Sequence, residues 1–152
     1  MYSRFILLIE DNEDDIKLTQ MAFKKNNIIN DLIIIKDGEE ALDYIFCRGS
    51  YSDRDINDMP TLILLDINLP KVDGIEVLRQ IRANKKTKLI PVVILTSSKE
   101  EKDLINGYSL GCNSYICKSV NFNEFTLAMK QLGLYWLIIN EEPPKIVGGI
   151  NG

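Results

Sequence analysis

The 152-residue sequence contains no histidine, and this absence excludes several kinds of site. Ser-His-Asp triads, imidazole metal ligands and imidazole general bases all need a residue that the chain lacks. The three cysteines, Cys47, Cys112 and Cys117, form no CxxC pair, which argues against both a zinc site and a disulfide framework. We expect them to be reduced thiols in a cytoplasmic protein.

Long hydrophobic runs and basic stretches are also absent. The first apolar run, Phe5–Ile9, is too short for a signal peptide and is followed by Glu10 and Asp11. No segment approaches the roughly 18 apolar residues of a transmembrane helix. The net charge is −4, so neither nucleic acid nor an anionic membrane is an expected partner. The GxGxxG and P-loop motifs are missing, which argues against the two common nucleotide sites.

The sequence does contain a regular alternation of short apolar runs and amphipathic segments. The runs predict strands over Phe5–Ile9, Leu32–Ile35, Thr61–Asp66, Pro91–Thr96 and Tyr115–Lys118. Helical spacing predicts helices over Asn12 to about Asn26, Gly38–Phe46, Gly74 to about Asn84, Lys99–Leu110, and Asn121 towards Asn140. This order predicts one α/β domain with a doubly wound, five-stranded parallel sheet, five helices and an extended last helix.

The same spacing predicts which side chains of each helix face the sheet. The expected inward residues are Leu18, Met21 and Ala22; Ala41, Leu42 and Ile45; Ile75, Leu78 and Ile81; and Leu104, Ile105 and Tyr108. Asn121, followed by Glu124, resembles a capping box at the start of the last helix. The polar segment 47–60 is longer than usual for its place, and is interpreted either as a binding loop or as a mobile insertion.

Polar side chains stand where four of the predicted strands end. Glu10 and Asp11 follow the first strand, and Asp66, Thr96 and Lys118 end the third, fourth and fifth. Because parallel strands end at one edge of a sheet, we expect these groups to meet. Three carboxylates without imidazole suit Mg²⁺ or Mn²⁺. Such a metal, with the hydroxyl and the ammonium, would position a phosphoryl group for attack by Asp66.

Each of these residues alone has an ordinary structural interpretation, but their motifs together resemble the receiver domain of two-component response regulators. The matching segments are 9–11, 64–74, 93–98 and 111–118. The resemblance implies a flavodoxin-like receiver over residues 1–140 and a tail over 141–152. It implies that Asp66 is the phosphoacceptor and that Thr96 and Lys118 bind the phosphoryl group. It also implies that Glu10, Asp11, Asp66 and the backbone carbonyl of Asn68 hold the metal, and that Thr96 and Tyr115 form the switch.

A narrower resemblance is to the stand-alone receivers that serve cyanobacterial and other bacterial phytochromes. The shared features are the Asp-x-Asn-Leu-Pro motif at 66–70, the long loop before the third strand and the extended last helix. The implied partner is a sensor histidine kinase of phytochrome type. Twelve tail residues cannot form an effector domain, so output is expected through binding to an unknown downstream protein. The chain is expected to turn over no separate substrate and so not to be an enzyme.

Two features leave alternatives open. Receivers usually follow the lysine with a cis proline, but Ser119 follows Lys118, so this peptide bond is either a costly cis bond or part of a trans turn.

A phosphatase with an aspartyl nucleophile would need a second aspartate where Asn68 stands. A receiver-fold binding module without phosphorylation is the other alternative, and the complete set of acid, hydroxyl and lysine argues against it.

The last predicted helix carries more apolar side chains than one buried stripe requires. The stripe consists of Phe122, Phe125, Met129, Leu132, Trp136 and Ile139. Leu127, Leu134, Leu137 and Ile138 fall largely outside it and would be exposed in a monomer. We therefore expect a homodimer through these four residues. The alternative is that the tail folds back to cover them.

Overall fold

The structure is a computed structural model, and it describes residues 4–97, 100–118 and 121–133. The strands are β1 (Phe5–Ile9), β2 (Asp31–Ile35), β3 (Leu62–Leu65), β4 (Val92–Thr96) and β5 (Ser114–Cys117). The helices are α1 (Glu13–Lys25), α2 (Gly38–Ile45), α3 (Gly74–Ala83), α4 (Glu101–Ser109) and α5 (Phe122–Leu132), with a 3₁₀ turn η1 (Gly49–Tyr51) after α2. The predicted order of elements is confirmed. The predicted continuation of the last helix to Asn140 lies outside the described residues.

All neighbouring strands run parallel, in the order β2-β1-β3-β4-β5. Every residue of β1, β3 and β4 is buried, as expected for apolar strands covered on both faces. The chain leaves β1 for the edge strand β2 and then returns across β1 to form β3. The winding therefore reverses between β1 and β3. Open α/β sheets bind their ligands at the carboxyl ends of the strands at such a reversal.

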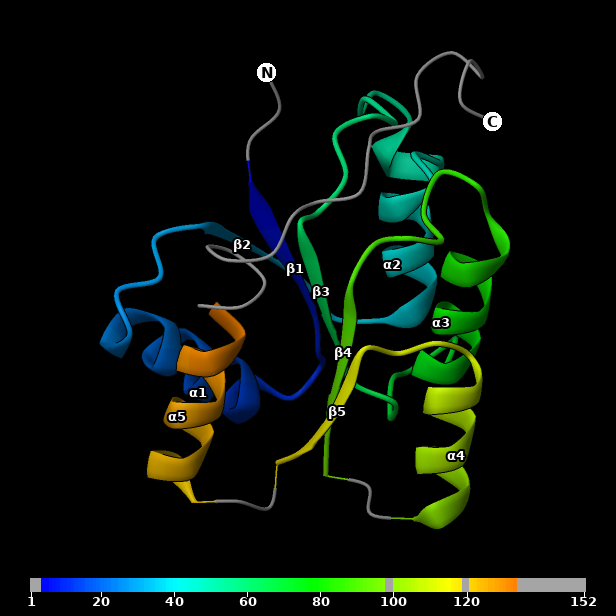
Figure 1. Ribbon diagram of the computed structural model, residues 1–152. Helices are drawn as coiled ribbons and strands as arrows, with labels where there is room; N and C mark the ends of the chain where they lie inside the picture. The colour runs from blue at the N-terminus through cyan, green and yellow to red at the C-terminus, as the bar shows by residue number, and fades with distance from the viewer. Residues whose placement is uncertain (1–3, 98–99, 119–120, 134–152) are drawn as a thin grey trace.

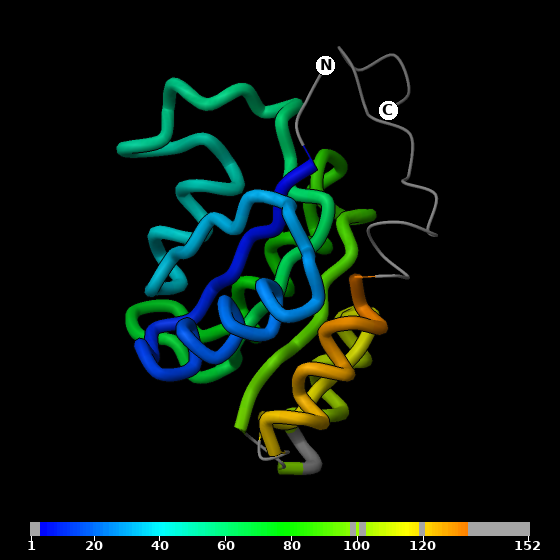
Figure 2. The backbone as a smooth tube through the Cα atoms, turned by 90° about the vertical axis from the view of Figure 1, so that its left-hand side faces the viewer, coloured from blue at the N-terminus to red at the C-terminus, as the bar shows by residue number. Residues whose placement is uncertain are grey.

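Helices cover both faces of the sheet. In Figure 1, α1 and α5 lie on one face and α2, α3 and α4 on the other. Figure 2 shows α1 and α5 side by side in front of the strands. The residues of β1 alternate between the two halves of the core: Ile6 and Leu8 pack towards α1 and α5, while Leu7 and Ile9 pack towards α2 and α3.

Four helices begin at side-chain caps that the sequence supplies. Asn12, Asp37, Asp73 and Asn121 each accept a hydrogen bond from the backbone N–H three residues later, at the starts of α1, α2, α3 and α5. Each of these bonds satisfies one of the N–H groups that a helix start leaves unpaired. The predicted cap at Asn121 is thereby confirmed.

The predicted inward faces of α2 and α3 are largely confirmed, whereas that of α1 is partly wrong. Ala41, Leu42 and Ile45 of α2 and Leu78 and Ile81 of α3 are buried, although Ile75 is only half-buried. In α1, Ala22 is buried as predicted, but Met21 is 57% exposed and Leu18 is half-buried. The buried face includes Thr19 instead, whose hydroxyl donates to the Asp15 carbonyl at 3.0 Å. A hydroxyl satisfied within its own helix can face the core, which an apolar pattern does not reveal.

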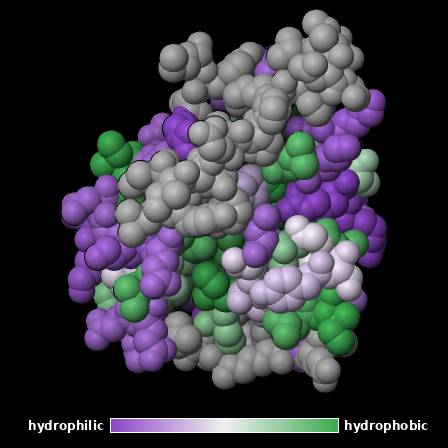
Figure 3. All heavy atoms as spheres, viewed as in Figure 1, coloured by the Kyte–Doolittle hydropathy of each residue, from purple (hydrophilic) through white to green (hydrophobic). Residues whose placement is uncertain are grey.

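The predicted inward face of α4 is wrong. Leu104, Ile105 and Tyr108 are 41%, 55% and 52% exposed, and Figure 3 shows hydrophobic side chains at the surface over this helix. Gly107, by contrast, is buried, and a Cβ at this position would lie 2.7 Å from Cδ1 of Ile94. The helix approaches the sheet through a glycine, so its large apolar side chains project towards solvent.

The loop at 47–60 is folded against α2. The guanidinium of Arg54 lies 3.8 Å from the centre of the Tyr44 ring. It donates hydrogen bonds to the carbonyls of Tyr44 and, at 2.6 Å, of Asp58. Tyr51, in η1, donates its hydroxyl to Glu40 of α2 at 2.6 Å. These contacts favour a structured loop over the mobile insertion that the sequence left open.

Candidate functional site

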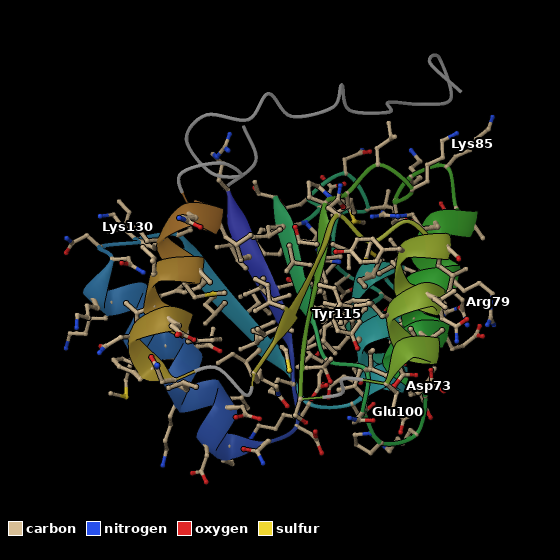
Figure 4. All side chains as sticks on the ribbon, turned by 60° about the horizontal axis from the view of Figure 1, so that its bottom comes forward. Asp73, Arg79, Lys85, Glu100, Tyr115 and Lys130 are labelled. Atoms are coloured by element: carbon tan, nitrogen blue, oxygen red, sulfur yellow. The ribbon has the colours of Figure 1, made fainter. Side chains whose placement is uncertain are left out.

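Backbone hydrogen bonds carry the ladders of the sheet one residue past the strands and fix the start of each functional loop. Glu10 N–H donates to the Ile35 carbonyl at 2.9 Å, and Asp66 N–H donates to the Ile9 carbonyl at 3.0 Å. At the other side of the sheet, Lys118 N–H donates to the Thr96 carbonyl at 2.8 Å. The predicted side chains therefore leave the sheet at a single edge, which is turned towards the viewer in Figure 4.

The ammonium group of Lys118 links this edge together. Its Nζ lies 2.5 Å from Oε1 of Glu10, 2.8 Å from Oδ2 of Asp15 and 3.3 Å from Oδ2 of Asp66. An ammonium has three donors, and three carboxylates here match them. The side chains of Lys118, Glu10 and Asp66 are only 5%, 2% and 8% exposed, so these ion pairs are shielded from bulk water.

Glu10, Asp11 and Asp66 form a carboxylate cluster beside this lysine. Carboxylate oxygens of the three residues lie within 4.8 Å of one another, and Asp11 is exposed while the other two are buried. Oxygen ligands of this kind, open to water on one side, are suited to Mg²⁺ or Mn²⁺. The donor set therefore fits the predicted metal. A divalent ion would also reduce the repulsion among the three acids.

Burial shapes the titration of the two innermost groups. It raises the pKa of Glu10 to about 7, and the Asp66 carboxylate acts in the same direction, while the hydrogen bond from Lys118 opposes the shift. Burial by itself would lower the pKa of Lys118, but its hydrogen bonds to Asp15 and Glu10 outweigh this and raise it. Lys118 is therefore a permanent cation at neutral pH.

The loop after Asp66 is packed tightly enough to fix its position. Asn68 N–H donates to Oδ1 of Asp66 at 3.2 Å, and Gly74 N–H donates to the Ile67 carbonyl at 2.8 Å. A Cβ on Gly74 would lie 2.1 Å from the Asp66 carbonyl oxygen, so the start of α3 contacts the backbone of the candidate nucleophile directly. Lys71 has a φ of 68°, in the left-handed region that is uncommon for a non-glycine residue.

Thr96 and Tyr115 lie on the face of the sheet that α4 covers. Thr96 is fully buried at the end of β4, and Tyr115 pairs with Ile94 in the β4–β5 register. Because side chains alternate along strands, Ile94, Thr96 and Tyr115 share the face of the sheet that α4 covers. Figure 4 places Tyr115 between the strands and the helices on that side, and its ring centre is 6.5 Å from that of Tyr108 in α4.

Sequence reasoning missed one residue of the site and anticipated others that the structure does not describe. Asp15, in the first turn of α1, contacts Lys118, although no sequence pattern distinguishes it from the other acids of that turn. Its position one turn after Glu10 and Asp11 is shared with Asp14, so the spacing alone does not identify it. The Lys118–Ser119 bond and the predicted interface residues Leu134, Leu137 and Ile138 lie outside the described residues.

The sheet order, the acid cluster at the winding reversal and the buried lysine together define a receiver of two-component signalling. The sequence model of the response regulator receiver domain matches residues 6–130, and the chain belongs to this family. The predicted fold and family are therefore confirmed. Within the part of the chain that the structure describes, no helix has the length and apolarity needed to cross a membrane.

Particular relatives place the chain close to receivers that are associated with phytochromes. It is 41% identical over 134 residues to the response regulator Rcp1 of Synechocystis sp., covering 88% of this chain and 89% of Rcp1. The crystal structure of Mn²⁺-bound Rcp1 has a TM-score of 0.83 at 40% identity, covering 93% of this chain and 99% of that chain. The phosphorylated cyanobacterial phytochrome response regulator RcpA has a TM-score of 0.84 at 38% identity, with the same coverage.

Proposed function

We propose that Asp66 accepts a phosphoryl group from a sensor histidine kinase of phytochrome type, in a reaction that needs Mg²⁺ or Mn²⁺. The observation that carries this proposal is the Asp66 carboxylate, which lies 3.3 Å from the buried Lys118 ammonium and within 4.8 Å of the Glu10 and Asp11 carboxylates. A carboxylate oxygen attacks phosphorus while the bond from phosphorus to the donor nitrogen breaks. The result is an aspartyl phosphate.

The residues of the site match what phosphoryl transfer requires, which is mostly positioning and neutralisation of charge. Glu10, Asp11, Asp66 and the Asn68 carbonyl would hold the metal, which would neutralise charge on the phosphoryl oxygens. Lys118 is a second cation that is already in place beside Asp66. Thr96, at the end of the neighbouring strand, would bind a further phosphoryl oxygen. The manganese in Rcp1 and the phosphorylated state of RcpA support both parts of this proposal.

Labelling by acetyl phosphate tests the phosphoacceptor. We expect Mg²⁺-dependent labelling of the unmodified chain, and loss of labelling in Asp66→Asn and in the presence of EDTA. Asp53→Asn is the matched control, because Asp53 is an exposed aspartate in the loop after η1, away from the sheet edge. Labelling that persists in Asp66→Asn would show that another residue accepts the phosphoryl group.

The choice of kinase is tested by transfer from purified phosphorylated kinases. A phytochrome-type histidine kinase should phosphorylate the chain faster than a histidine kinase with an unrelated sensor domain. Equal rates would contradict the phytochrome assignment while leaving the role of Asp66 intact.

We propose that Thr96 and Tyr115 transmit the phosphorylated state to the surface around α4 and β5. Support comes from their shared face of the sheet and from the Tyr115 ring beneath α4, where a Cβ on Gly107 would lie 3.5 Å from Tyr115 Cδ2. A phosphoryl group can shift such a switch only if it binds the two states differently, and Thr96 supplies that difference. Thr96→Ala should abolish the effect of phosphorylation on binding of the downstream protein. An unchanged effect would exclude Thr96 from the switch.

We also propose a homodimer through the last helix, formed by Leu127, Leu134, Leu137 and Ile138. Leu127 is 54% exposed, so this helix presents an apolar side chain to solvent, which supports an interface there. The alternative, a tail that folds back over these residues, predicts a monomer. Light scattering should give a dimer for the unmodified chain and a monomer for Leu134→Glu with Ile138→Glu. A monomer in both cases, with and without phosphorylation, would exclude the dimer.

A further inference from the structure

Among the three carboxylates that contact Lys118, Asp15 is the one outside the proposed metal site. Its Oδ2 lies 2.8 Å from Nζ, closer than the Asp66 oxygen at 3.3 Å. The Asp15 side chain is 32% exposed, whereas the Lys118 side chain is 5% exposed, so Asp15 meets the ammonium from the solvent side of the cluster. The contact joins α1 to the end of β5, across 103 residues of sequence.

The backbone of Asp15 is held on both sides, which fixes the position from which its side chain extends. Its N–H donates to Oδ1 of the helix cap Asn12 at 3.0 Å. Its carbonyl accepts the hydroxyl of the buried Thr19 at 3.0 Å. Ordinary stabilisation of a helix start by an acid needs no contact with a particular cation such as Lys118, because the helix dipole acts on any carboxylate of the first turn.

Charge balance gives this contact a specific consequence. A divalent ion at Glu10, Asp11 and Asp66 would neutralise two of the three partners of Lys118 and repel the ammonium itself. Asp15 would then be the remaining full negative charge in contact with Nζ. Without it, the ammonium would be free to move away from the phosphoryl group just when the metal prepares the site for transfer.

We propose that Asp15 is a positioning residue for phosphoryl transfer: it holds the Lys118 ammonium beside Asp66 while the metal is bound. This inference rests on the proposed role of Asp66, but it concerns a residue that touches neither the metal nor the phosphoryl group. It assigns to α1 a direct part in phosphoryl transfer, in addition to covering the sheet.

The first test is the rate of phosphorylation by acetyl phosphate at saturating Mg²⁺. Asp15→Ala should slow the reaction about tenfold or more, the loss expected for one partly buried charged hydrogen bond. Asp15→Asn, which keeps the shape and one acceptor, should be phosphorylated at a rate between those of Asp15→Ala and the unmodified chain. Asp15→Glu should recover most of the rate. Asp14→Ala is the matched control. Asp14 lies in the same turn and carries the same charge, but it is exposed and makes no ion pair within the described residues.

The second test needs no phosphorylation and follows Lys118 itself. In EDTA and in Mg²⁺, an amine-reactive reagent is applied briefly and modification of Lys118 is quantified by mass spectrometry of its peptide. Asp15→Ala should increase this modification, most strongly in Mg²⁺, whereas Asp14→Ala should leave it unchanged.

The outcomes separate this inference from the proposed function. If the unmodified chain is not labelled on Asp66, the proposed function fails, but the accessibility of Lys118 still decides whether Asp15 holds it. If labelling occurs and Asp15→Ala matches Asp14→Ala in both measurements, the positioning role is wrong. Equal slowing by Asp15→Ala in the unmodified chain and in Lys118→Met would also overturn it, because Asp15 would then act independently of the lysine.

Discussion

Replacement of Arg82 by methionine should destabilise the fold without affecting the site. Arg82 lies in the last turn of α3, and its guanidinium binds the loops that precede β4 and β5. Nε donates to the Gly111 carbonyl at 2.9 Å, Nη1 to the Ile90 carbonyl at 2.7 Å, and Nη2 to Oδ1 of Asn113 at 3.1 Å. The same Asn113 oxygen accepts a hydrogen bond from Val92 N–H at 2.8 Å. Arg82 therefore supports the start of β4 directly, through the Ile90 carbonyl, and indirectly, through Asn113.

The magnitude follows from the exposure of these acceptors. The Gly111 carbonyl lies in an exposed contact, where water can replace the arginine at little cost. The Ile90 carbonyl lies in a partly buried contact, and loss of its charged donor should cost about 1.5–3 kcal/mol. The favourable interaction of Arg82 with the carboxyl end of α3 contributes roughly 0.3–1 kcal/mol more. Methionine keeps the apolar stem, so we expect the free energy of unfolding to fall by about 2–4 kcal/mol.

Urea denaturation followed by circular dichroism measures this change. Arg79→Met is the control on the same helix, because Arg79 forms only an exposed pair with Glu76 among the described residues, worth about 0.2–0.5 kcal/mol. Phosphorylation of Asp66 should be unaffected by either change, since Arg82 acts at the amino ends of β4 and β5. Equal losses of stability in the two variants would refute this account of the Arg82 contacts.

Two further substitutions test other parts of the structure. Gly74→Ala should lower the free energy of unfolding by about 2–4 kcal/mol and slow phosphorylation, because the new Cβ would lie 2.1 Å from the Asp66 carbonyl oxygen and would have to displace it. Stability and a phosphorylation rate equal to those of the unmodified chain would contradict this packing. Arg54→Met should expose the 47–60 loop to limited proteolysis and cost about 2–4 kcal/mol, because it removes the stacking on Tyr44 and the charged donor to the partly buried carbonyls of Tyr44 and Asp58. Arg48→Met is its control, since Arg48 is about half exposed and lies 5.4 Å from the Phe46 ring centre, and equal cleavage of the two variants would refute the role of Arg54.

The order and type of the elements could be predicted because the chain supplies a separate local signal for each. Continuous apolar runs gave the central strands, and cap residues such as Asn121 gave helix starts. The inward face of α4 could not be predicted in the same way. A pattern method seeks large apolar residues, while this helix packs through Gly107 and leaves Leu104 and Ile105 at the surface. The order of the strands is likewise not encoded in the periodicity of any one strand.

The candidate site was predictable where it depends on the ends of strands. Glu10, Asp66 and Lys118 could be expected at one edge because parallel strands all end there, and the structure places them in contact through Nζ of Lys118. Their roles in phosphorylation and metal binding stay predictions. Asp15 escaped notice because an acid in the first turn of a helix already has a sufficient explanation in the helix dipole. Only the three-dimensional path of the Lys118 side chain distinguishes Asp15 from Asp14.

The same topology explains why these charges are present at all. Two nearly buried carboxylates, Glu10 and Asp66, lie where the winding of the sheet reverses, and burial of such groups costs several kcal/mol each before pairing. Lys118 offsets part of that cost, but one ammonium cannot neutralise Glu10, Asp66, Asp15 and the neighbouring Asp11. Well-packed apolar residues of similar volume are often neutral or more stable than buried ion pairs. Folding therefore gives no reason for this arrangement, whereas a site that must attract a divalent cation and place a second cation beside a nucleophile requires an excess of acids.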